Sequence, residues 1–398
     1  MKNLKIFTKN IEDKAIEQIN LLLEQESFKN SKVRIMPDVH AGKGCVIGFT
    51  GDLGTKVIPN IVGVDIGCGM FCANLGKRDI DYKKLDEFIN NNIPHGMNVN
   101  ETKLVDFDLA RLNCYKQLKN IEWIENSLGS LGGGNHFIEI DIAEDGEKYL
   151  IIHTGSRNLG VQIANYYQEL ANQICNYNTD EIDKQIEEVI SNYKKLGKEK
   201  EIQNKIKELK KEKETNKNKI PYELAYLENK NRELYLQDMK ICQEFAIKNR
   251  YTIASQIANY MNWNIEDYFE TIHNYISFDD NIVRKGAISA EKDKKVLIPI
   301  NMRDGCIIAI GKGNDDWNNS APHGAGRIMS REKAKETIKL EDYKETMKNI
   351  YTTSISEETK DEAPFAYKPI EEILENIIPT VEVIKIIKPV YNFKSKDI

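Results

Sequence analysis

Residues 60–70 read NIVGVDIGCGM, a short apolar run interrupted by three glycines. Together with KVRIM (32–36) and GCVIGFT (44–50), this stretch predicts short buried strands joined by tight turns. The same texture returns at 127–144 (SLGSLGGGNHFIEIDIAE) and 149–160 (YLIIHTGSRNLG), where strand-like runs adjoin glycine-rich loops. Functional side chains tend to lie in loops at the ends of strands, so we expect these loops to carry the site.

The composition is that of a globular protein. The 398 residues are 40% hydrophobic and 30% charged, which excludes a fibrous or disordered chain. At roughly 150 residues per domain, one large domain or two to three ordinary ones are expected. No apolar run approaches the ~18 residues of a membrane helix, and the first residues lack the apolar core of a signal peptide. We therefore expect a cytoplasmic protein with no membrane partner.

The seven cysteines are scattered and form no CxxC pair. This pattern argues against a disulfide framework and against a zinc ribbon. A cysteine with a special role is therefore expected to be a thiolate ligand or a nucleophile.

Residues 179–248 are rich in Lys, Glu and Asn, nearly free of glycine, and carry isoleucine and leucine at helical spacing. We interpret them as an inserted helical hairpin. Residues 181–220 carry a net charge of +3, whereas the rest of the chain carries −9, for a total of −6. A solvated helical face is the more common explanation of such charge, and an RNA-facing arm is the alternative.

The histidines carry the strongest indication of chemistry. Four of the six, His40, His136, His153 and His323, lie inside glycine-rich loops. A single histidine is more often a surface residue or a hydrogen-bonded core residue than a ligand, so each needs support from its neighbours.

Asp65 and Cys68 stand three residues apart on a glycine-flanked turn, which could direct a carboxylate and a thiolate at one ion. Imidazoles from His136, His153 and His273 would complete a mixed set of ligands for two divalent metals that share the Cys68 thiolate. Taken singly, Cys68 could be a small buried hydrophobe and Asp65 a turn or cap residue.

His323 lies in APHGAGRIMSR (321–331), where glycines permit close approach of a ligand and Arg327 can bind phosphate. A histidine in such a loop could be a metal ligand, a general acid or a nucleophile that accepts a phosphoryl or nucleotidyl group. The chain has no GxxxxGK[ST] motif and no strand–GxGxxG–helix unit, so a P-loop or Rossmann enzyme is not expected.

Eight motifs follow one another as in the RtcB family of RNA-splicing ligases, which the chain resembles over about residues 30 to 395. They are MPDVHAGKGCVIG (36–48), VGVDIGCGM (62–70), GSLGGGNHFIEI (129–140), IIHTGSRNLG (151–160), VRKGAISA (283–290), PHGAGRIMSR (322–331), DEAPFAYK (361–368) and PVYNFK (389–394). The resemblance implies one large α+β catalytic domain over residues 1–398, with mixed β-sheets flanked by helices and the hairpin of 179–248 inserted in it.

The resemblance also implies a reaction. Such an enzyme joins an RNA 3′-phosphate or 2′,3′-cyclic phosphate end to a 5′-hydroxyl end, using GTP and two Mn²⁺ ions through a histidine–GMP intermediate. An archease-type activator is a possible partner, tRNA halves or broken RNA ends are the substrates, and the oligomeric state stays open. A thiolate and three imidazoles bind zinc or copper more tightly, so manganese is implied by the resemblance alone.

Carried over by motif, His323 is the guanylylated nucleophile. The metal ligands are Asp65, Cys68, His136, His153 and His273, with Cys68 bridging. The nucleotide contacts are Asn135, Glu139, Gly324, Gly326, Arg327, Tyr367 and Lys394. Asp38 and His40 fit better as residues that position substrate or ligands, and turn-stabilising roles are an equal alternative for them.

The segment 283–290 departs from the family's usual HRKGATRA, because Val283, Ile288 and Ser289 replace a histidine, a threonine and an arginine. Because Ser289 lacks the positive charge of the arginine, a contact with RNA or with the triphosphate is in question. The five expected metal ligands are all present. The departure favours a divergent branch that repairs broken RNA.

Two other classes of function compete with the ligase. One is a metal-dependent RNA-end phosphodiesterase or phosphatase without productive ligation, and the other is an RNA-binding or assembly factor. Retention of His323 favours the ligase over the first, and a complete ligand set disfavours the second.

Overall fold

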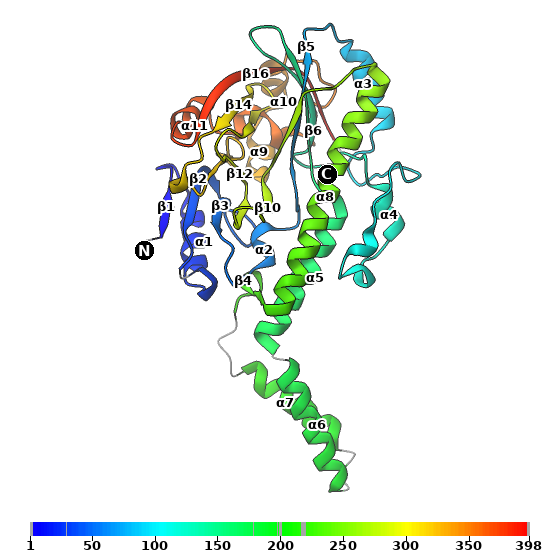
Figure 1. Ribbon diagram of the computed structural model, residues 1–398, viewed down its shortest axis with the longest axis vertical. Helices are drawn as coiled ribbons and strands as arrows, with labels where there is room; N and C mark the ends of the chain where they lie inside the picture. Colours follow the sequence, from blue (N-terminus) through cyan, green and yellow to red (C-terminus); the bar gives the residue numbers. More distant parts are fainter. Residues whose placement is uncertain are drawn as a thin grey trace.

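The computed structural model describes residues 3–28, 30–177, 179–196, 198, 201–215 and 220–395. These form a body of mixed β-sheets with helices on its outer faces, from which a narrow arm projects (Figure 1). The expectation of an α+β fold is confirmed.

A seven-stranded sheet forms the larger half of the body. Its strand order is β13-β14-β16-β6-β7-β5-β9, and all of its neighbouring pairs are antiparallel. The two end strands approach each other, because the Leu297 amide of β13 donates to Thr271 Oγ1 of β9 at 3.1 Å. The sheet is therefore almost closed into a barrel. Its strands are β5 (Gly69–Gly76), β6 (Phe137–Ile142), β7 (Lys148–Thr154), β9 (Tyr268–Ile272), β13 (Lys295–Asn301), β14 (Gly305–Gly311) and β16 (Val381–Lys394).

Alternation along β6 shows how the sequence divides this sheet into two faces. Ile138 and Ile140 pack outward in the cluster that contains Ile253 and Ile257 of helix α8. Phe137 packs inward, and strand alternation places Glu139 and Asp141 on the same inner face. The interior of the near-barrel is therefore apolar with two buried carboxylic acids.

A five-stranded sheet lies beside the near-barrel, in the order β1-β2-β3-β11-β10. Its strands are β1 (Leu4–Ile6), β2 (Val33–His40), β3 (Ile47–Asp52), β10 (Asn274–Ile276) and β11 (Ile282–Lys285), and only β1 and β2 pair in parallel. Two short ladders join β12 (Ala287–Ser289) to β15 (Ser320–Pro322) and β4 (Lys56–Val57) to β8 (Leu227–Glu228). The chain passes directly from β9 to β10 at His273, so that residue lies where the two large sheets meet.

Helices cover the sheets. Those of the body are α1 (Asp13–Leu23), α2 (Pro59–Val62), α3 (Tyr82–Asn92), α4 (Ile121–Asn126), α5 (Arg157–Tyr177), α8 (Asn229–Met261), α9 (Arg331–Thr337), α10 (Leu340–Thr346) and α11 (Ile370–Ile377). The longest is α8, whose 33 residues span about 50 Å. Its Ile253, Ala254 and Ile257 pack on the outer face of the near-barrel.

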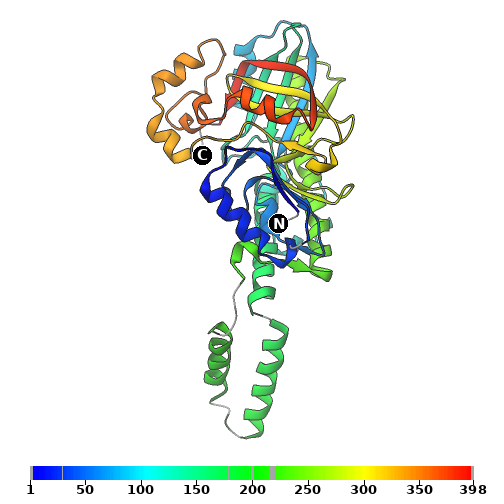
Figure 2. The ribbon, with the colours of Figure 1, turned by 90° about the vertical axis from the view of Figure 1, so that its left-hand side faces the viewer.

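Helices α6 (Thr179–Lys195) and α7 (Ile202–Thr215) lie side by side and project away from the body in both views (Figures 1 and 2). The sequence interpretation places the hairpin at residues 179–248, but residues 229–248 are the first part of α8, and their Tyr235, Met239 and Phe245 are buried in the core. At the base of the arm, Asn176 exchanges two 2.9 Å hydrogen bonds with the backbone of Ile220. The arm therefore leaves and rejoins the body at neighbouring points.

Across the part of the chain that the structure describes, no helix is both long enough and apolar enough to cross a bilayer.

Candidate functional site

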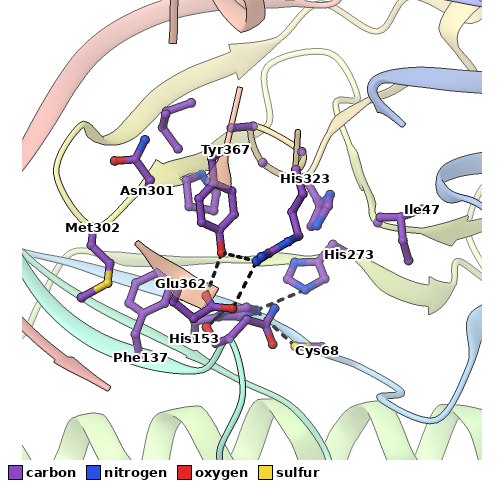
Figure 3. A pocket seen from close by; sticks show the side chains of 18 of the residues that line it. Ile47, Cys68, Phe137, His153, His273, Asn301, Met302, His323, Glu362 and Tyr367 are labelled. Carbon is purple, nitrogen blue, oxygen red and sulfur yellow. Dashed lines mark hydrogen bonds and ion pairs between the residues drawn. The ribbon is translucent and has the colours of Figure 1, made fainter. Parts of the chain in front are cut away.

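A cavity of about 250 Å³ opens where the mouth of the near-barrel faces the five-stranded sheet. Figure 3 shows side chains of Cys68, His153, His273 and His323 converging on it, with Glu362 and Tyr367 close by. The cavity therefore gathers residues from segments that are far apart in the sequence.

The residues predicted as metal ligands form one continuous cluster. The Cys68 Sγ lies 3.2 Å from His153 Nε2 and 3.5 Å from His136 Nε2. His153 Nε2 is in turn 3.3 Å from His273 Nε2, and His136 Nε2 is 3.3 Å from Asp65 Oδ2. Two triads result, Cys68–His153–His273 and Asp65–Cys68–His136, and they share the Cys68 sulfur.

Strand register places these side chains. His153 of β7 is paired with Phe137 on one side and with Met70 on the other, so it lies one residue from the His136 loop and two residues from Cys68. The His273 amide donates to the Cys68 carbonyl at 2.9 Å and fixes the β9–β10 junction beside the turn. Backbone hydrogen bonds thus bring together four segments of chain.

Backbone carbonyls bind the Nδ1 atoms of two histidines and so orient their Nε2 atoms toward the cluster. His136 Nδ1 is 2.9 Å from the Leu131 carbonyl, and His153 Nδ1 is 3.1 Å from the Asn135 carbonyl. A carbonyl can only accept, so each Nδ1 carries a proton. His153 Nε2 therefore presents its lone pair to the cluster, whereas His136 Nε2 faces the Asp65 carboxylate at 3.3 Å. This is the arrangement that holds metal-binding histidines.

Burial keeps His153, His273 and the Cys68 thiol in their neutral forms. It lowers the pKa of His153 and of His273 well below the ordinary value, and it raises the pKa of the Cys68 thiol, with a further rise from Asp65. For Asp65, burial acts to raise the pKa, but the hydrogen bond and charge of His136 outweigh it and lower the pKa to about 2.

The donor set fits divalent cations. It offers one thiol, three imidazoles and one carboxylate in two triads that share Cys68, and the ligand atoms of each triad lie within 4.8 Å of one another. Among the described residues, His273 Nδ1 is buried without a hydrogen-bond partner. A cation would replace the thiol proton and relieve the polar groups that burial leaves unsolvated.

His323 lies beside this cluster and is held by Asp38. Its Nδ1 is 2.6 Å from Asp38 Oδ2, and the same oxygen accepts from the His323 backbone amide at 3.1 Å. The ring centroids of His323 and His273 are 5.0 Å apart. Asp38 is fully buried, so the carboxylate fixes both the backbone and the ring of His323 and leaves Nε2 as the unblocked nitrogen.

Gly326 explains why the loop after His323 must be glycine-rich. It has φ of +76°, and a Cβ atom there would lie 2.5 Å from the Asp38 carbonyl oxygen. A larger residue would therefore push the loop away from Asp38. Gly324 also lines the cavity, and a Cβ atom there would lie 3.1 Å from the Pro299 carbonyl oxygen.

The other end of the cavity is a charged network around Glu362. This carboxylate accepts from Lys394 Nζ and Tyr367 Oη, each at 2.7 Å, and pairs with Arg331 at 2.7 Å and Arg327 at 3.4 Å. Burial alone would raise the pKa of Glu362, but the charges of Lys394 and Arg331 outweigh it and lower the pKa to about 2. A polar ligand that enters the cavity can take over hydrogen bonds that these cationic groups and the Tyr367 hydroxyl now make with Glu362.

The remaining predicted contacts also line the cavity. Asn135 supplies its carbonyl to His153 and to Lys394 Nζ, the latter at 3.4 Å. Glu139 accepts from Asn392 Nδ2 at 2.6 Å. Every residue predicted as nucleophile, metal ligand or nucleotide contact lines this cavity except His136, which contacts the lining residues Asp65 and Cys68. Of the two predicted positioning residues, His40 lines the cavity and Asp38 lies behind His323.

Sequence reasoning missed the residues that tie the glycine loops together. Arg250 of α8 is fully buried and donates to the carbonyls of Gly67 and Thr154 at 2.8 and 2.9 Å. Its neighbour Asn249 accepts from the Gly129 amide at 2.7 Å and donates to the Gly155 carbonyl at 3.1 Å. Nothing in the local sequence distinguishes them from ordinary polar residues of a charged helix. Glu362 was missed although it lies in the DEAPFAYK motif (361–368), because the resemblance assigned a contact only to Tyr367 of that motif.

The three departures from the family pattern lie away from the cavity. Val283, Ile288 and Ser289 are buried in β11 and β12, and none of them lines it. The neighbouring Arg284 is also buried, and it pairs with Asp280.

The fold and the cavity define a class: a near-barrel protein with a cysteine–histidine cluster of metal-type donors beside a histidine held by an aspartate. Comparison with known proteins gives the family. The chain matches the family described as "tRNA-splicing ligase RtcB" over residues 24–120 and 113–395, and it belongs to the RtcB family.

Two relatives show how far the similarity extends. "RNA-splicing ligase RtcB" of Escherichia coli strain K12 is 28% identical over 430 aligned positions, covering 97% of this chain and 96% of that protein. "tRNA-splicing ligase RtcB" of Nanoarchaeum equitans is 27% identical, covering 93% and 89%.

Proposed function

We propose that this protein is a GTP- and Mn²⁺-dependent RNA ligase that joins RNA 3′-phosphate or 2′,3′-cyclic phosphate ends to 5′-hydroxyl ends through a His323–GMP intermediate. The observation that carries the proposal is the position of His323, with Nδ1 on the buried Asp38 and its ring 5.0 Å from the cluster residue His273. Membership of the RtcB family supports it.

His323 is arranged as a nucleophile. Asp38 keeps the proton on Nδ1, so the Nε2 lone pair is available to attack the α-phosphorus of GTP. The new N–P bond replaces the bond to pyrophosphate, which leaves. The ring then carries positive charge, which the adjacent Asp38 carboxylate stabilises.

Two cations fit the cluster, one held by Asp65, Cys68 and His136, the other by Cys68, His153 and His273. Bound divalent cations neutralise charge on phosphate oxygens and orient them for in-line displacement. Cys68 belongs to both triads, so its side chain fixes the spacing of the two positions.

The Glu362 network is the proposed guanylate pocket. Lys394 and Tyr367 are the contacts for guanine, while Arg327 and the glycines of 324–326 adjoin His323 and are the contacts for phosphate. Asn135 connects the two regions, because its carbonyl contacts both His153 and Lys394, and Glu139 lines the same cavity.

In the second half of the reaction, an oxygen of the RNA 3′-phosphate attacks the phosphorus of His323–GMP and the N–P bond breaks. The incoming 5′-hydroxyl then attacks the activated 3′-phosphate, loses its proton and displaces GMP. A cyclic phosphate must first be opened by water. The substrates proposed are tRNA halves or broken RNA ends, with repair of broken RNA favoured by the divergent 283–290 segment, and an archease-type activator is a candidate partner.

The test is intact-protein mass spectrometry after incubation with GTP and Mn²⁺, with ATP and Mg²⁺ as the control. We expect a gain of one GMP that is absent in His323→Ala and retained in His95→Ala, a histidine variant outside the cavity. An adduct on His323→Ala would contradict the assignment of the nucleophile. A metal-loaded wild type that never acquires GMP, with or without an activator, would favour the phosphodiesterase alternative.

A further inference from the structure

A second group of metal-type donors lies inside the near-barrel. Glu139 and Asp141 of β6 and Cys306 of β14 place one ligand atom each within 4.8 Å of one another. Their exposed fractions are 3%, 0% and 0%. Glu139 also lines the main cavity, whereas Asp141 and Cys306 do not. The group therefore lies beneath the cavity, on the inner face of the sheet.

Asp141 is the unusual member. Apart from the Cys306 thiol, which lies close enough to donate to the carboxyl group, neither carboxylate oxygen has a hydrogen-bond partner among the residues that the structure describes, although the side chain is completely buried. The surrounding inner face is apolar, with Phe137, Ile151 and Ile387. A buried carboxyl group in such surroundings needs a proton or a cation to be tolerated.

The donor geometry favours a cation. Three triads of this kind occur in the described part of the chain, and the other two are the halves of the Cys68 cluster. The Asp141 triad contains none of the Cys68 cluster's residues. Cys72, on the same inner face, lies close enough for the charge of Asp141 to raise its thiol pKa, after the larger effect of burial. Cys72 is thus a further buried thiol on this inner face, outside the three donors that lie within 4.8 Å of one another.

Glu139 has a free ligand atom. One of its oxygens accepts from Asn392, which leaves the other for the group formed with Asp141 and Cys306. Strand order adds a structural role, because β14 and β6 do not pair with each other and are separated by β16. An ion between Cys306 and Asp141 would connect two strands that share no hydrogen bonds.

We propose that Glu139, Asp141 and Cys306 form a third cation site, separate from the Cys68 cluster, that binds a zinc-class divalent ion. Carboxylate oxygens with a thiolate are a donor set that Zn²⁺ accepts. Binding displaces the protons that Asp141 and the Cys306 thiol carry in the metal-free protein, and these protons pass to solvent. The ion orients Glu139 at the floor of the cavity.

The first test counts ions. The full-length protein is stripped with a chelator, reloaded with Zn²⁺, freed of excess metal and analysed for zinc per chain. We expect Asp141→Asn and Cys306→Ser each to bind one ion fewer than the wild type, and Cys175→Ser, a cysteine variant far from the group, to bind the same number. Circular dichroism identifies any variant that has not folded, and the near-isosteric Asp141→Asn keeps the test valid if Cys306→Ser is unstable.

The second test uses Co²⁺ in the Cys68→Ala protein, where the thiolate of the main cluster is gone. We expect a thiolate-to-cobalt absorption band in the near ultraviolet that disappears in Cys68→Ala/Cys306→Ser. Equal zinc content in wild type and Asp141→Asn, or no thiolate band once Cys68 is removed, would overturn the proposal and assign a proton to Asp141. Neither measurement uses GTP or RNA, so the outcome is independent of the proposed ligase activity.

Discussion

Asp38 Oδ2 accepts two hydrogen bonds from one residue, from the His323 ring at 2.6 Å and from the His323 backbone amide at 3.1 Å. One buried oxygen therefore sets both the direction of the ring and the path of the loop that carries it. We expect Asp38→Asn to slow formation of the GMP adduct by about 10²–10⁴-fold, because the amide no longer stabilises a charged ring. The rate is measured by mass spectrometry over time.

Metal content should be unchanged in Asp38→Asn, since Asp38 lies outside both triads. The control is Asp52→Asn, a strand aspartate whose carboxylate accepts from the Lys32 amide. A normal adduct rate in Asp38→Asn would show that the aspartate only stabilises the turn.

Gly155 allows Asp65 to reach the Cys68 cluster. A Cβ atom at this position would lie 2.2 Å from Asp65 Oδ1 and 3.2 Å from the Cys68 Cα. We expect Gly155→Ala to weaken metal affinity by about ten- to a hundredfold, because Asp65 must move. Metal titration followed by calorimetry measures the effect. Gly54→Ala, with no atom closer than 3.7 Å to the added carbon, should bind as the wild type does.

Arg250 joins helix α8 to the loops of the cluster. Its side chain is fully buried and pairs with Glu270 at 3.0 Å in addition to its two carbonyl contacts. Arg250→Met should lower the free energy of unfolding by roughly 3–5 kcal/mol, because two carbonyls and a largely buried carboxylate would have no partner. Urea unfolding gives the value. A decrease below about 1 kcal/mol would show that the loops do not depend on Arg250.

The Glu362 network predicts a specific acid sensitivity. An unfolded glutamate has a pKa of about 4.3, whereas the charges of Lys394 and Arg331 outweigh burial and lower the folded pKa of Glu362 to about 2. The folded state thus binds fewer protons, so the carboxylate stabilises the fold above pH ~4.3 and this contribution is lost as the pH falls toward 2.

We expect melting temperature to fall less steeply between pH 4.5 and 2.5 in Glu362→Gln than in the wild type. Glu357→Gln is the control, because Glu357 is 62% exposed in its ion pair with Lys360. Identical slopes for Glu362→Gln and wild type would contradict the lowered pKa.

The arm offers a test of RNA binding. Lys194, Lys195 and Lys198 are exposed at the end of α6 and just beyond it. Residues 178–219 can be replaced by a short glycine linker, since Asn176 and Ile220 are hydrogen-bonded neighbours. We expect the deletion to weaken RNA binding and to reduce the slope of log K against log salt by about one for each phosphate group that the arm neutralises in the intact protein. An unchanged slope would show that these lysines are only solvated.

Local sequence patterns determined much of this protein. The strand-like runs FIEIDI and YLIIHT lie in β6 and β7, and VEVIKIIKPVYNF forms all but the last residue of β16. These runs are rich in β-branched and aromatic residues, which favour strands because they pack well on a pleated, buried surface. Glycine-rich loops around His136, His153 and His323 indicated where polar chemistry lies. Helical spacing predicted the arm, but the predicted end at residue 248 is too far along the chain, because residues 229–248 belong to α8. The sequence could not locate this boundary, since a charged helix in solvent and the start of α8 have the same composition.

Only the tertiary structure decided which residues meet. His136, His153 and His273 come from segments separated by up to 137 residues, and strand register brings them within 3.5 Å of a shared partner or of one another. Burial gives three polar residues their roles: Asn249, Arg250 and Glu362. The sequence does not predict that a polar residue in a charged segment is buried. A periodic pattern reports which face of an element is buried, whereas a site depends on long-range pairing, and long-range pairing is fixed only when the whole core packs.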